Sequence, residues 1–165
     1  NEQNLAELTR QLVKAQEVND QLKYGSLIVE MKKLQLQNEE ILLLQNEQRK
    51  RVKYFQGGNL YKLLQQASEN DVILITEKDW EEVWKAIDWM YPSFNKHLSD
   101  VFPGLPIQTR QLCWLTKIGI KPIGIARILK RSRQAISNTR TKLNGIIADS
   151  SLPDTNFDDF ITNLS

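Results

Sequence analysis

The first 56 residues contain no proline and a single glycine, Gly25, and this lack of helix breakers constrains the fold more than any other feature. Leu, Gln, Glu, Lys and Asn dominate the segment, and all of them are compatible with a helix. Gly57, Gly58 and Asn59 follow, and they are residue types that end helices. The sequence therefore predicts one long helix over residues 1–56.

Apolar residues in this segment recur at alternating spacings of three and four, which is the seam of a coiled coil. The register shifts beyond residues 24–26, where we expect the coil to be interrupted or rewound. The predicted dimerisation residues are Leu5, Leu8, Leu12, Ala15, Asn19 and Leu22 before the shift, and Leu27, Met31, Leu34, Asn38 and Ile41 after it. An asparagine in the seam favours two strands, so we expect a homodimer, parallel or antiparallel. The alternatives are a bundle with another helix, or an amphipathic helix on its own globular domain.

Charge is segregated along the chain. Residues 1–53 carry 9 basic and 8 acidic residues, and residues 54–105 carry 4 basic and 8 acidic residues. Residues 106–147 carry 9 basic residues and no acidic one, whereas residues 148–165 carry 4 acidic and no basic residues. Ordinary protein surfaces mix both signs, so the acid-free segment predicts a face that binds a polyanion.

Three short helices are expected within this basic segment, over about 107–118, 122–130 and 133–147. Gly119 ends the first, Pro122 begins the second, and Ser132 is a good N-cap for the third. This pattern is typical of a helix-turn-helix, and a generic three-helix bundle is the alternative. We therefore expect an all-α chain in four parts: a coiled-coil helix (1–56), a helical connector (57–105), a helix-turn-helix domain (106–147) and an acidic tail (148–165) whose short helix, about 157–164, docks on the middle helices.

Residues 119–140, GIKPIGIARILKRSRQAISNTR, resemble the LuxR/NarL-type helix-turn-helix, which is similar to region 4 of sigma factors. The flanks at 91–105 and 157–161 look like those of a subgroup of bacterial regulators. In that subgroup a periplasmic tetratricopeptide sensor, one membrane helix and a cytoplasmic coiled coil precede the domain. The resemblance implies a cytoplasmic transcription regulator tethered to the inner membrane. Gly124 and Thr139 depart from the family pattern, which usually has an acidic residue and a histidine there.

The third predicted helix carries the candidate DNA contacts. Those predicted to contact bases are Arg133, Gln134, Ser137, Asn138 and Thr141. Arginine suits a guanine edge, and Gln134 or Asn138 suits adenine. Those predicted to contact phosphates are Lys117, Lys121, Lys130, Arg131, Arg140 and Lys142. The expected partners are double-stranded DNA and a second copy of the chain. The alternative is a coiled-coil scaffold whose basic head binds an acidic protein surface, such as one of RNA polymerase.

Several other classes of function find little support in the sequence. With one cysteine, Cys113, and one histidine, His97, we expect neither a disulfide framework nor a metal site. We expect no enzyme, cofactor or small-molecule site, because no nucleophile–base pair and no phosphate-binding glycine loop is present. No apolar run approaches the roughly 20 residues needed to span a bilayer. The chain begins at Asn1 within a polar helical pattern, so we interpret it as a fragment of a longer protein, and its single cysteine suits the reducing cytoplasm.

Overall fold

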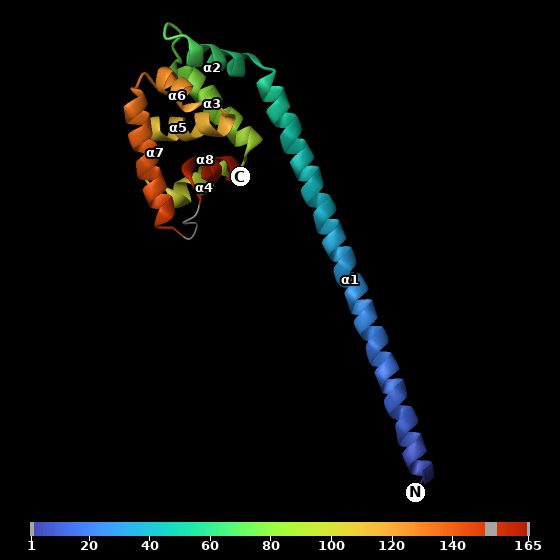
Figure 1. Cartoon of the computed structure of the whole chain (residues 1–165). Helices are drawn as coiled ribbons and strands as arrows, with labels where there is room; N and C mark the ends of the chain where they lie inside the picture. The colour runs from blue at the N-terminus through green and yellow to red at the C-terminus, as the bar shows by residue number, and fades with distance from the viewer. Residues whose placement is uncertain (1, 151–154, 165) are drawn as a thin grey trace. The chain divides into compact units, whose positions relative to one another are not determined.

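The computed structural model describes residues 2–150 and 155–164, which form eight helices and no strand (Figure 1). The prediction of an all-α chain with a long N-terminal helix is confirmed. None of these described helices is long and apolar enough to cross a membrane. The helices are α1 (Glu2–Gln56), α2 (Asn59–Glu69), α3 (Glu77–Met90), α4 (Phe94–Val101), α5 (Ile107–Ile118), α6 (Pro122–Leu129), α7 (Arg133–Ala148) and α8 (Phe157–Asn163).

The chain divides into two compact units, Asn1–Glu47 and Gln48–Ser165. The first unit is the greater part of α1, and the helix is continuous through residues 24–26. The side chains of the predicted seam are all exposed, from 51% for Ile41 to 71% for Leu12 among the large apolar ones. The described residues of this unit therefore form no hydrophobic core of their own.

The second unit, residues 48–165, has one hydrophobic core. Its bounds therefore differ from the expected division of the chain at residues 56 and 105. The end of α1 belongs to this unit, where Phe55 is 8% exposed. Leu64 in α2 and Ile87 in α3 are fully buried in the same cluster as Leu115 in α5. Residues 57–105 are therefore part of the C-terminal domain rather than a connector, because their apolar faces complete its core.

The segment between α2 and α3 begins with a turn, in which the Ile73 N–H donates to the Asn70 backbone oxygen at 3.2 Å, and it pairs with no strand among the described residues. A capping box then starts α3. The Thr76 hydroxyl accepts a hydrogen bond from the Asp79 N–H at 3.1 Å, and the Asp79 carboxylate accepts one from the Thr76 N–H at 2.9 Å. This arrangement satisfies N–H groups that a helix start otherwise leaves unpaired.

The tail docks on the domain through α8, whereas residues 151–154 of the predicted tail lie outside the described residues. Phe157 and Ile161 are fully buried, and Phe160 packs edge-on against Phe102 with 5.7 Å between ring centroids. The main neighbours of α8 are α5 and α7, so the helix contacts the basic segment itself more than the aromatic middle helices. The Asn144 side chain of α7 accepts the N–H of Phe157 at 2.6 Å and so fixes the start of α8.

Candidate nucleic-acid interface

The turns around α6 follow from local sequence. Gly119 ends α5 with φ of 103°, a left-handed conformation that glycine adopts without steric cost. Pro122 occupies the first turn of α6, where its missing N–H leaves no hydrogen bond unmade. Ser132 caps α7 by accepting the N–H of Ala135 at 3.0 Å. These signals explain why the three helices begin and end within about a residue of their expected bounds.

Residues 130–132 form the turn between α6 and α7, and Lys130 adopts φ of 56° there. Lys130 is the only described residue other than glycine with a positive φ. This conformation costs about 1 kcal/mol for a residue with a Cβ. The Lys130 side chain is held in place, because its Nζ donates to the backbone oxygen of Asp71 at 2.5 Å.

One side of α7 faces the core and the opposite side faces solvent. Ile136 and Leu143 are buried, at 1% and 3% exposure. The helical period of 3.6 residues places a stripe of Gln134, Asn138 and Thr141 on the opposite side. The five residues predicted to contact bases, Arg133, Gln134, Ser137, Asn138 and Thr141, are all exposed, and α7 runs along one edge of the second unit (Figure 1).

The outward face of α7 has two parallel stripes. We call Gln134, Asn138 and Thr141 the amide stripe, in which the Gln134 Nε2 donates to the Asn138 Oδ1 at 2.8 Å. Arg133 and Ser137 lie beside it, next to α6, where a shallow hollow of about 280 Å³ opens. The hollow is lined by Pro122, Ile123, Arg133, Ile136, Ser137 and Arg140.

The residues predicted to contact phosphates fall into two groups. Lys121, Lys130 and Lys142 are exposed and Arg131 is half-buried, and all four lie on α7 or at the ends of α6. Arg140 is different, because its guanidinium forms an ion pair with Asp158 of α8. The acid-free segment therefore meets an acid in space that is distant in the sequence.

Lys117 faces the tail rather than α7. Its Nζ donates to the backbone oxygens of Thr162 at 2.8 Å and Leu164 at 2.6 Å, and lies 4.3 Å from the centre of the Tyr91 ring. Burial lowers the pKa of Lys117 to about 8. These contacts give Lys117 a structural role at the C-terminal end of α8, and leave its ammonium hydrogens engaged within the protein.

The close approach of α2 to α6 is the main feature that sequence reasoning missed. A Cβ added at Gly124 would lie 2.8 Å from the Ser68 Cβ and 3.1 Å from the Ile120 Cγ2. Gly124 is therefore the residue that lets the two helices touch. The only available signal was the glycine itself, inside an otherwise apolar helix.

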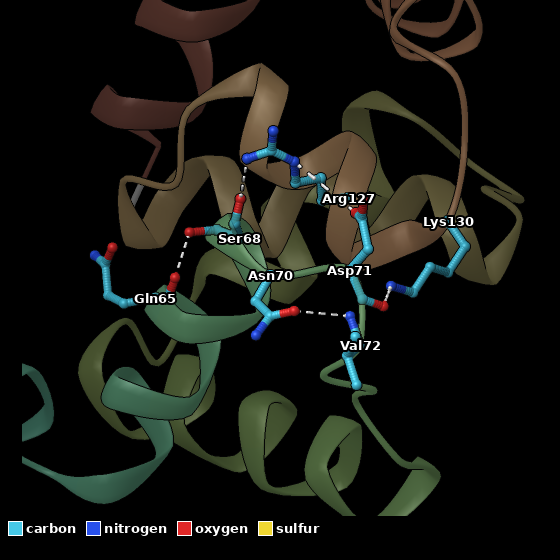
Figure 2. A network of polar contacts seen from close by, with 7 residues as sticks. All are labelled: Gln65, Ser68, Asn70, Asp71, Val72, Arg127 and Lys130. Atoms are coloured by element: carbon cyan, nitrogen blue, oxygen red, sulfur yellow. Dashed lines mark hydrogen bonds and ion pairs between the residues drawn. The ribbon is translucent and has the colours of Figure 1, made fainter.

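A network of polar contacts also joins the end of α2 and the turn after it to α6 (Figure 2). The Arg127 guanidinium donates to the Ser68 backbone oxygen at 3.3 Å and lies 3.9 Å from the Asp71 carboxylate. Asn70 accepts the N–H of Val72 at 3.0 Å, which shapes the turn that brings Asp71 to Lys130. Arg127 and Lys130 thus anchor the end of α2 to α6.

The rest of the described surface offers no metal site, since no group of three or more His, Cys, Asp or Glu side chains in it could hold an ion. Cys113 is fully buried, and burial raises the pKa of its thiol to about 12, so the thiol is inert. Comparison with models of protein families, with curated proteins and with solved structures finds no significant match.

Proposed function

We propose that this chain is a sequence-specific DNA-binding transcription regulator that dimerises through the first unit of α1. The observation that carries the proposal is the outward face of α7, which is polar and exposed and belongs to a segment of 42 residues, 106–147, without an acidic residue. With its side chains an α-helix is about 10–12 Å across, which matches the roughly 12 Å width of the major groove.

The residues then have distinct roles. Arg133 hydrogen-bonds a guanine edge, Gln134 or Asn138 hydrogen-bonds an adenine edge, and Ser137 and Thr141 contribute hydroxyls beside them. Lys121, Arg131 and Lys142 contact phosphates, and each phosphate neutralised makes the slope of log affinity against log salt concentration more negative by about 0.9. Lys130 and Arg140 join them only to the extent that DNA competes with Asp71 and Asp158.

The exposed seam of the first unit supports the dimer in this proposal. The exposed seam of the first unit would be covered by a second copy, and two copies of α7 would contact two half-sites about 34–36 Å apart or a multiple of that distance. The resemblance to LuxR/NarL-type regulators adds a cytoplasmic location and a tether to the inner membrane. No enzymatic activity, cofactor or small-molecule ligand is part of the proposal.

A binding-site selection on random duplex DNA tests the proposal. We expect the full chain to enrich a motif with two half-sites, at two salt concentrations, and Arg133→Ala to weaken the preference for one guanine by about 1 to 3 kcal/mol. Lys62→Ala, an exposed basic residue of α2, is the matched control, and it should leave the motif unchanged. Binding that is sensitive to salt but enriches no motif would overturn the proposal, and would favour a scaffold that binds an acidic surface such as that of RNA polymerase.

A further inference from the structure

Two side-chain amides lie at the most outward part of α7. Gln134 and Asn138 are one helical turn apart and both exposed, and they are joined by the Nε2–Oδ1 hydrogen bond of 2.8 Å. They face away from Ile136 and Leu143, whereas Arg133 and Ser137 lie to one side, next to α6. The amide pair is therefore the part of α7 that would reach deepest into a groove.

The hydrogen bond couples the orientation of the Asn138 amide to that of the Gln134 amide. If the Asn138 amide alone were reversed, its Nδ2 would face the Gln134 Nε2, and two donors would meet. In the orientation present, the Oδ1 keeps a second lone pair and the Nδ2 keeps two hydrogens. Adenine offers in the major groove the complement of that pair, an N7 acceptor beside an N6–H donor.

The same bond takes one of the two Nε2 hydrogens of Gln134. Gln134 keeps one hydrogen and its Oε1, whereas Asn138 keeps both Nδ2 hydrogens and one Oδ1 lone pair, so Asn138 has the larger donor capacity left for a base. Keeping the bond costs nothing further on binding, because the two amides are already ordered relative to each other. The bond thus favours one recognising amide and one supporting amide over two independent ones.

We propose that Asn138 recognises an adenine in the major groove, and that Gln134 is the positioning residue that orients the Asn138 amide. The inference rests on the proposed DNA binding and deepens it, because it specifies one base of each half-site and the residue that selects it. It also separates the two amides, which the sequence alone leaves as equivalent candidates for adenine.

The first test replaces a single atom of DNA. In the motif enriched by the full chain, the adenine is replaced by 7-deazaadenine, which lacks the N7 acceptor but keeps its pairing with thymine. We expect the wild-type chain to bind this DNA about 5- to 10-fold more weakly, as for one lost hydrogen bond to a base. Asn138→Asp, which has the same shape without the donor, should bind both DNAs with equal affinity. Equal binding of both DNAs by the wild-type chain would overturn the assignment.

The second test is a double-mutant cycle on adenine discrimination, measured as the ratio of affinities for the motif and for a motif with guanine at that position. Gln134→Met removes the donor but keeps the length of the side chain, and should lower the ratio about 3- to 10-fold when Asn138 is present. In an Asn138→Ala background the same substitution should change the ratio less than about 1.5-fold. Additive effects would show that Gln134 contacts a base independently, and would overturn the inference.

The controls separate the inference from the proposal on which it rests. Gln21→Met makes the same chemical change at an exposed position of α1 outside the seam, and should leave both ratios unchanged. Thermal unfolding of every variant checks the fold. If the wild-type chain enriches no motif, the proposed function fails and the inference fails with it, whereas a motif together with additive effects of Gln134 and Asn138 overturns the inference alone.

Discussion

The two units of the chain place the same residue type in opposite environments. Leu12 and Leu34 in the first unit are 71% and 56% exposed, whereas Leu64 and Leu115 in the second unit are fully buried. Most helix stability in proteins comes from packing of an apolar face rather than from the helix itself. The second unit therefore has a core that stabilises it, whereas the apolar side chains of the first unit are left exposed in the single chain.

Deletion of the tail is the strongest test of the statement that the second unit is stabilised by its own core. Deleting residues 148–165 removes Phe157, Phe160 and Ile161 from the core, and should lower the free energy of unfolding of the second unit by at least about 3 kcal/mol. Denaturant unfolding measures the loss. Ile146→Ala, at an exposed position of α7, is the control and should change stability far less. An unchanged free energy after the deletion would mean that the core does not depend on α8.

A pair of glycines sharpens the comparison within the second unit. Gly124→Ala should destabilise it by about 1 to 3 kcal/mol, because the new Cβ would displace α2 from α6. Gly145→Ala in α7 has nothing within 4 Å of its new Cβ, and should stabilise the unit by about 0.5 to 1 kcal/mol. Both are measured by chemical denaturation. If both substitutions stabilise the protein, the contact between α2 and α6 does not form in solution.

The seam proposed for the first unit is tested by measuring how the association of the chain depends on its concentration. Leu34→Ala should raise the dissociation constant of the dimer about tenfold, and should leave the unfolding of the second unit unchanged, because Leu34 lies in the seam and is exposed in the single chain. Analytical ultracentrifugation measures the association. Leu43→Ala is the matched control outside the seam, where the leucine is 66% exposed. Equal effects of the two substitutions would argue against this seam.

The smallest expected effect is a pH dependence that belongs to the second unit alone. Burial lowers the pKa of Lys117 to about 8 from its ordinary 10.5, so above pH 8 the unfolded chain binds more protons at this site than the folded chain. Stability should therefore rise with pH from about 8, and the burial penalty is fully present below that value. The slope between pH 7.5 and 9 should be steeper for the wild-type chain than for Lys117→Met. Above pH 9 the buried Cys113 thiol, whose pKa is raised to about 12, acts in the opposite direction.

Local sequence predicted the helices of the basic segment well because each boundary has a residue with a specific backbone role. Gly119, Pro122 and Ser132 act on the backbone of their immediate neighbours, so the helix ends that they set can be predicted without knowledge of the fold. The same holds for the exposed face of α7, which follows from the positions of Ile136 and Leu143 along one helix.

Contacts between distant segments could not be predicted in the same way. In the sequence Gly124 is only a departure from the pattern that residues 119–140 resemble, and the position of Ser68 shows it to be a contact. The charges were also counted by position in the sequence, and such a count does not show that Arg140 forms an ion pair with Asp158 of the tail. Lys117 was counted as a phosphate contact for the same reason, since nothing in its own helix indicates that α8 ends beside it.

The contact between Ser68 and Gly124 also offers a way to trace ancestry. A variant with an acidic residue in place of Gly124 would have to give up the docking of α2, because the new side chain has no room beside Ser68. Residues 68 and 124 should therefore vary together among natural variants. A lineage with small residues at both positions would keep α2 packed against α6. A lineage with a bulky residue at position 124 would have lost that contact.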